Sequence, residues 1–198
     1  MSKRLAKLTS DILNPFLISF VTILLFAFKA TSGAAEALKW AAIAIAFSVL
    51  PVWLIAIYLV RRRKLDGIFS NTRQQRTRVY PLAGICAVLG GIVLYYLGAP
   101  RLLVATFAAG LAAIAVFMGI NLTWKISLHT AFAAAAATVL IIVYGAAGAP
   151  AVVLLPLVGW ARVALGNHSP AQAIAGALLA AAIVFTVFYL FGLTGVGA

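Results

Sequence analysis

Residues 126–161 read ISLHTAFAAAAATVLIIVYGAAGAPAVVLLPLVGWA, which is 36 consecutive residues without Asp, Glu, Lys or Arg. A straight helix of that length measures about 54 Å at about 1.5 Å per residue, well beyond the roughly 30 Å of a bilayer's hydrocarbon core. In its middle, the segment Gly145-Ala-Ala-Gly-Ala-Pro150 is typical of a tight turn. The stretch therefore predicts two transmembrane spans joined by a turn.

Uncharged stretches of the same kind occur along the whole chain, at residues 12–28, 40–60, 80–100, 102–124 and about 170–193. They are solidly apolar and rich in alanine, without the alternation of a membrane β-strand. The second half of the long stretch, residues 149–165, is a short span and contains Pro156. The sequence predicts an all-α, polytopic membrane helical bundle with about six to seven transmembrane helices, forming a single integral membrane domain over residues 1–198.

The composition agrees with a membrane location and excludes several kinds of site. Hydrophobic residues make up 65% of the 198 residues and charged residues only 9%, whereas a soluble domain is about half apolar and a quarter charged. Asp11, Glu36 and Asp66 are the only acidic residues, so a carboxylate pair or a di-metal carboxylate site is not favoured. Cys86 is the single cysteine, which excludes an internal disulfide and a cysteine metal cluster. We expect no metal, no cofactor and no nucleic-acid partner.

The distribution of basic residues predicts the orientation in the membrane. With seven spans, three basic residues lie on one side (Lys29, Lys39 and Arg101) and twelve on the other (Lys3, Arg4, Lys7, Arg61, Arg62, Arg63, Lys64, Arg73, Arg76, Arg78, Lys125 and Arg162). Lys and Arg are enriched in cytoplasmic loops of membrane proteins. The N-terminus is therefore predicted to be cytoplasmic and the C-terminus to lie on the opposite side.

Three polar clusters stand at the predicted membrane edge, and the topology places all three on the cytoplasmic side. They are Asn71-Thr-Arg-Gln-Gln-Arg-Thr-Arg-Val-Tyr-Pro81, Trp124-Lys-Ile-Ser-Leu-His129 and Arg162-Val-Ala-Leu-Gly-Asn-His168. The only two histidines of the chain belong to the second and third clusters. For each histidine taken alone, an interfacial polar residue is the plainer interpretation, but their shared side of the membrane favours a common site.

The residue types in these clusters fit phosphoryl transfer. A phosphate ester needs cations for its oxygens, a nucleophile, and an acid for the leaving oxygen. His168 is the candidate nucleophile and His129 the candidate acid. The start of a helix near Ser127 supplies backbone N–H groups for an anion. The candidate phosphate-binding residues are Arg162, Ser127, Lys125, Arg73 and Arg76.

These residues resemble the ordered motifs of the type 2 phosphatidic acid phosphatase superfamily. Its third motif is Ser-Arg-x5-His-x3-Asp, and Arg162-x5-His168 keeps the core spacing. Its second motif, Pro-Ser-Gly-His, is similar to Ile126-Ser-Leu-His129, and the first, a Lys-containing motif ending in Arg-Pro, is loosely similar to the basic stretch ending Tyr80-Pro81. The resemblance implies a phosphatase-like core over about residues 73–193, in which His168 forms a phosphohistidine and His129 acts as the acid.

The chain departs from the family pattern at several positions. Ala161 replaces the family's Ser, and Ile126 and Leu128 replace Pro and Gly. Gln172 stands where the family has the Asp that orients the nucleophilic histidine. A Gln carbonyl can orient the ring, but it carries no charge. Ser169-Pro-Ala-Gln172 also fits a helix capping box, and the two roles can coexist.

Two functions of different classes follow. The first is a metal-independent phosphatase that acts on a lipid or isoprenoid phosphate or diphosphate at the cytoplasmic membrane edge, with anionic lipid head groups nearby. The alternative is a catalytically inactive, phosphatase-like membrane protein that serves as a subunit of a larger membrane complex. A small transporter is less favoured, because few polar residues lie in mid-span.

Overall fold

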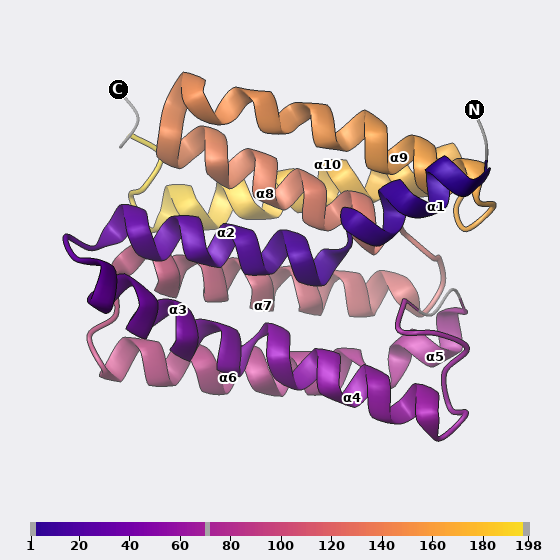
Figure 1. The fold of residues 1–198 in the computed structure, drawn as a ribbon, viewed down its shortest axis with the longest axis horizontal. Coiled ribbons are helices and arrows are strands. Elements are labelled where there is room, and N and C mark those ends of the chain that lie inside the picture. Colours follow the sequence, from indigo (N-terminus) through magenta and orange to yellow (C-terminus); the bar gives the residue numbers. More distant parts are fainter. Residues whose placement is uncertain (1–2, 70–71, 196–198) are drawn as a thin grey trace. The chain divides into compact units, whose positions relative to one another are not determined.

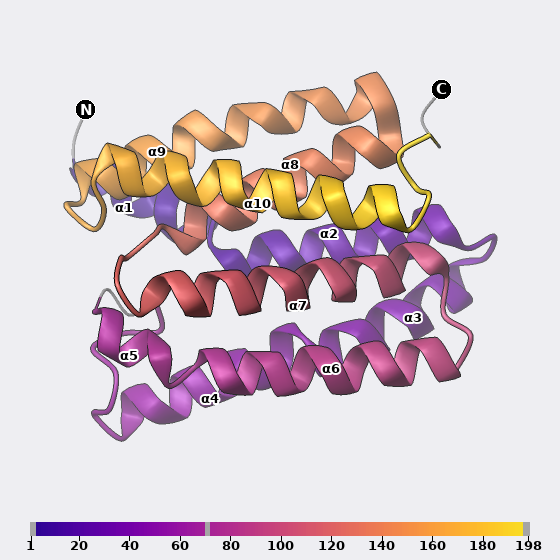
Figure 2. The same ribbon diagram turned by 180° about the vertical axis from the view of Figure 1, so that it is seen from behind.

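A computed structural model of the chain describes residues 3–69 and 72–195, apart from the side chain of Arg76 (Figures 1 and 2). Within these ranges the regular structure is entirely helical, which confirms the predicted all-α class. The elements are α1 (Lys3–Ile12), α2 (Pro15–Ala30), α3 (Ala34–Phe47), α4 (Val49–Arg61), α5 (Arg73–Thr77), α6 (Tyr80–Tyr96), α7 (Arg101–Asn121), α8 (Leu128–Tyr144), the 3-10 helix η1 (Gly145–Val153), α9 (Leu154–Ala164) and α10 (Pro170–Leu190).

Six helical segments among the described residues are long and apolar enough to cross a membrane, as expected of an integral, multi-pass membrane protein. Each segment overlaps at least one of the uncharged stretches that predicted a span. A chain in hydrocarbon must satisfy its backbone polar groups within a helix, so these stretches are helical. The segments are Lys3–Ala30, Ala34–Arg61, Arg73–Tyr96, Arg101–Asn121, Leu128–Ala164 and Pro170–Leu190.

The fifth of these segments folds back on itself. Gly145 has φ +59°, and after it η1 and α9 pack against α8, as Figure 1 shows (coral and orange). Gly148 lies so close to α8 that a Cβ atom there would overlap the carbonyl group of Leu140. From the helical rise per residue, α8 is about 26 Å long, and η1 with α9 about 35 Å. The chain reversal predicted at residues 145–150 is therefore confirmed, although these residues begin the 3-10 helix η1 and do not form a tight turn. Each arm is close to the length of one passage.

Packing divides the chain into two compact units. The terminal unit comprises residues 1–22 and 126–198, and the central unit comprises residues 23–125. The core of the terminal unit includes a cluster of Ile18, Ala133, Ala136 and Val158, which joins the start of α2 to α8 and α9. A single membrane domain over the whole chain stays a prediction.

The central unit consists of the end of α2 and the helices from α3 to α7. At Gly90, α6 comes close to both α3 and α7. A Cβ atom at this position would overlap the ring of Phe107 in α7 and the Cβ atom of Phe47 in α3. Ser48 separates α3 from α4, and its hydroxyl donates to the carbonyl oxygen of Ala44 at 2.6 Å. Such a bond to the preceding turn bends helices, so Ala34–Arg61 is one bent segment.

The chain begins with an amphipathic helix that the sequence did not reveal. In α1, Ala6 and Ser10 are buried against the rest of the terminal unit, and the basic residues Lys3, Arg4 and Lys7 are exposed. Asn14 then caps α2, since its Oδ1 accepts the N–H of Leu17 at 3.0 Å. Because Asn14 is the cap of α2 and Pro15 is its first residue, α1 ends before them and α2 begins in a new direction.

Candidate functional site

A tight turn between α9 and α10 brings Arg162 and His168 together. Gly166, at φ +69°, donates its N–H to the carbonyl of Val163 at 2.9 Å, and the Asn167 N–H donates to the carbonyl of Arg162 at 3.1 Å. These two bonds form a Schellman motif. The His168 N–H also donates to the Arg162 carbonyl, at 3.3 Å. The spacing Arg162-x5-His168 therefore covers the last residues of α9 and the turn that follows this helix.

Gln172 makes both of the contacts that the sequence left open. Its Oε1 accepts the N–H of Ser169 at 3.2 Å while its own N–H donates to the Ser169 hydroxyl at 3.2 Å, so the predicted capping box is present. The same Oε1 lies 3.2 Å from Nδ1 of His168. The amide oxygen of Gln172 can only accept a hydrogen bond, so the hydrogen of this contact belongs to His168 Nδ1. This tautomer leaves the lone pair of the ring on Nε2.

The start of α8 is fastened to the start of α10. Ser127 is the N-cap of α8: its hydroxyl accepts the Thr130 N–H at 3.4 Å, and its own N–H donates to the carbonyl of Gln172 at 3.1 Å. The Thr130 hydroxyl donates to the carbonyl of Ala173 at 2.8 Å. Gly176 allows this approach, because a Cβ there would stand 2.6 Å from the Ser127 carbonyl oxygen. His129, in the first turn of α8, is thereby placed at the same end of the unit as His168.

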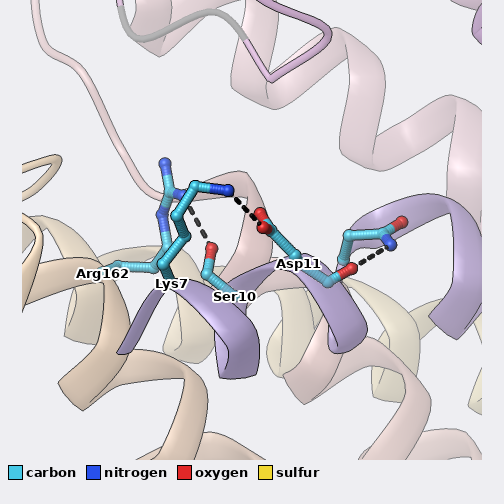
Figure 3. A network of polar contacts seen from close by, with 5 residues as sticks. Lys7, Ser10, Asp11 and Arg162 are labelled. Carbon is cyan, nitrogen blue, oxygen red and sulfur yellow. Dashed lines mark hydrogen bonds and ion pairs between the residues drawn. The ribbon is translucent and has the colours of Figure 1, made fainter. Parts of the chain in front are cut away.

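Arg162 contacts the N-terminal helix as well. Its Nη1 donates to the hydroxyl of Ser10 in α1 at 2.9 Å, as Figure 3 shows. On the exposed side of α1, Lys7 Nζ pairs with the Asp11 carboxylate at 2.8 Å. The α1–α9 contact therefore reaches the same end of the unit as the turn between α9 and α10.

Six polar side chains of the terminal unit are buried at this end. They are Ser10, Ser127, His129, Thr130, Arg162 and His168. Arg162 is only 4% exposed, and a buried cation is costly unless it is paired or solvated by polar groups. Asp11 is the only acidic residue in this unit's sequence, and it pairs with Lys7. Basic residues therefore outnumber acidic residues in the terminal unit.

The other three candidate phosphate-binding residues belong to the central unit. Arg73 Nη1 donates to the carbonyl of Leu122 at 2.6 Å and so caps the end of α7. Asn121 Nδ2 donates to the Arg73 carbonyl and to the Thr77 hydroxyl, each at 3.1 Å, which fastens α5 to α7. Lys125 ends this unit, and the side chain of Arg76 lies outside the described part of the chain. A contribution of these three to phosphate binding stays a prediction.

Two residues of the buried cluster were missed from the sequence. Thr130 resembles any threonine in a helix, and only its bond to Ala173 distinguishes it. Ser10 carries a weak signal: with Ala6 it forms the small-residue face of a short helix whose other faces are basic or apolar. That face indicates close packing, but its partner is 152 positions away and cannot be read locally.

No protein family, no curated protein and no solved structure matches this chain. Among the described residues, no three His, Cys, Asp or Glu side chains lie close enough together to hold a metal ion.

Proposed function

We propose that this chain is a membrane phosphatase that acts on a lipid or isoprenoid phosphate through a phosphohistidine at His168. The proposal rests on one observation: the turn after α9 joins the His168 N–H to the Arg162 carbonyl oxygen, and Gln172 Oε1 lies 3.2 Å from His168 Nδ1, beside the capped start of α8. A buried cation supplies the binding of phosphate oxygens. An imidazole with its proton held on Nδ1 supplies the nucleophile. The resemblance to the type 2 phosphatidic acid phosphatase superfamily supports the same assignment.

In the first step, Nε2 of His168 attacks phosphorus and the bond between phosphorus and the ester oxygen breaks. His129 donates a proton to the departing oxygen, which leaves as an alcohol. Arg162 binds the non-bridging oxygens, whose charge spreads as the bond breaks. The Gln172 carbonyl keeps the proton on Nδ1 of His168 as the ring becomes an imidazolium.

In the second step, water attacks the phosphohistidine. His129, now neutral, takes a proton from the water, and the bond between phosphorus and Nε2 breaks. Inorganic phosphate leaves and both histidines return to their starting forms. Every step uses side chains of the terminal unit, and the apolar tail of the substrate is expected to lie among the spans.

The test of this function is release of phosphate by the purified protein in detergent. Phosphatidic acid, phosphatidylglycerophosphate and polyprenyl diphosphates are supplied separately, each with and without a chelator. Release that resists the chelator supports the proposal. Absence of release from all of them favours the alternative below.

The active end of the terminal unit is proposed to face the cytoplasm. In a Cys86→Ala background, Asn167→Cys and Gly67→Cys should react with a membrane-impermeant thiol reagent only from the cytoplasmic side, and Thr194→Cys only from the opposite side. The expectation follows from the excess of basic residues and from α10, which is about 31 Å long and separates Asn167 from Thr194. Labelling of Asn167→Cys and Gly67→Cys from different sides would contradict the orientation.

The turn at Gly166 offers a prediction with a matched control. Gly166→Ala places a side chain in the left-handed region, which costs about 1 kcal/mol, and shifts His168 relative to Arg162. Gly192, at φ +66°, forms the same motif at the end of α10, with bonds to Tyr189 and Phe188. Both variants should lower the unfolding temperature to a similar extent, but only Gly166→Ala should lower phosphate release, by about tenfold. Equal activities of the two variants would show that the turn does not set the catalytic geometry.

Because position 172 holds Gln instead of an acidic residue, an acidic substitution there is predicted to raise the rate of phosphate release. In Gln172→Glu, which has the same length, a carboxylate oxygen can accept both the Ser169 N–H and the His168 Nδ1 hydrogen, and its charge stabilises the imidazolium and the start of α10. We expect turnover to rise about tenfold, or about 1.4 kcal/mol. Gln172→Asp should gain less, because its shorter side chain reaches less far. A Gln172→Glu variant with turnover below that of the wild type would contradict the orienting role.

One observation favours the alternative, a catalytically inactive relative that serves as a subunit of a membrane complex. Gln172 completes a capping box and brings no charge to the histidine, which a purely structural role fully explains. In that case neither acidic variant has measurable turnover, and His168→Ala changes no measured property except stability.

A further inference from the structure

The N-terminal helix reaches the proposed site through the side chain of Ser10. Ser10, which is 2% exposed, accepts a hydrogen bond from Nη1 of Arg162 at 2.9 Å. The two residues lie 152 positions apart, and the helices that carry them, α1 and α9, pack on one another. Figure 3 shows the Arg162 side chain standing beside α1, with its guanidinium directed toward the Ser10 hydroxyl.

A hydroxyl at this place has a particular consequence for a cation. A guanidinium is planar, so an acceptor on Nη1 restricts both the side-chain rotamer and the plane in which its other N–H groups point. A carboxylate in the same place would fix the plane too, but it would also neutralise the charge and compete with an anionic ligand. The nearest carboxylate along the helix, Asp11, pairs instead with Lys7.

We infer that Ser10 is a positioning residue for Arg162, so that α1 completes the site that binds the phosphate of a phosphomonoester. The inference rests on the proposed function. Ser10 holds the guanidinium in the orientation that meets two phosphate oxygens, and its neutral hydroxyl does so without adding a negative charge beside Arg162. Ser10 itself forms and breaks no bond in the reaction.

The test compares Ser10→Ala with Thr9→Ala in the full chain, using phosphatidic acid as substrate. Thr9 is the adjacent position of α1, half-buried on a different face, and it provides a matched loss of a hydroxyl group. Ser10→Ala should lower kcat/KM by about tenfold, mainly through a higher KM, and should weaken inhibition by inorganic phosphate to the same extent. Thr9→Ala should match the wild type. Ser10→Cys, which keeps the number of side-chain heavy atoms of serine but is a poor acceptor, repeats the measurement if Ser10→Ala does not fold.

A double-mutant cycle with Arg162→Lys separates positioning from packing. If Ser10 acts through Arg162, Ser10→Ala should have no further effect on kcat/KM in the Arg162→Lys background. An equal loss in both backgrounds would assign Ser10 to packing and overturn the inference, as would a Ser10→Ala variant with wild-type KM and phosphate inhibition. If the wild type releases no phosphate from any substrate and inorganic phosphate does not raise its unfolding temperature, the proposed function fails and the inference fails with it.

Discussion

His168→Ala should abolish phosphate release, with a loss of about a thousandfold or more, because the proposed mechanism passes through a covalent intermediate on His168. The remaining rate would come from phosphate binding by Arg162 and the helix start near Ser127. Turnover is measured with the substrate that the wild type hydrolyses best, over a protein concentration range that reveals such a loss.

Ser169→Ala is the control for this variant. It removes the N-cap of α10, directly beside His168, and should lower stability by about 1 kcal/mol while most of the turnover remains. A His168→Ala variant that is folded and retains even a tenth of the wild-type rate would rule out His168 as the nucleophile.

Arg162→Lys should lose about a hundredfold to a thousandfold in kcat/KM, and Arg162→Ala should be at least as poor. A guanidinium binds two phosphate oxygens side by side, whereas an ammonium is a point charge that cannot reproduce this geometry. The loss of one donor to developing charge has an effect of this size in other enzymes. Inhibition by inorganic phosphate should weaken in parallel.

Arg61→Lys is the matched control, since Arg61 is exposed at the end of α4 and its predicted role is topology alone. It should leave both kcat and KM unchanged. Wild-type kcat/KM in Arg162→Lys would show that Arg162 serves topology or packing and does not bind phosphate. Phosphate binding would then have to be assigned to other residues.

Much of the fold could be predicted from the sequence because the bilayer restricts it so strongly. Uncharged stretches of about 20 residues form helices in a bilayer, and the segment from Gly145 to Pro150 ends α8. The first helix escaped prediction for the opposite reason. α1 is short, basic and mostly exposed, and it is held by its packing against α9, a contact that no local pattern encodes.

The candidate site was predictable to the extent that its spacing is local. Arg162 and His168 are separated by one helix end, and Gln172 follows one helical turn later, so sequence distance and spatial distance agree. Ser10 and Thr130 could not be predicted, since their partners lie far along the chain and a single hydroxyl carries no periodic signal. For Arg73 the sequence indicated a basic residue near the membrane edge, but not that its guanidinium caps α7.

The most direct measurement of the central claim is detection of the covalent intermediate. Protein mixed briefly with substrate labelled in its phosphoryl group is quenched in alkaline denaturant, which preserves phosphohistidine, and is digested for mass spectrometry. We predict a phosphoryl group on His168 in the wild type and none in His168→Ala. Steady release of phosphate with no label on His168 at any quench time, or with label on another residue, would contradict the claim.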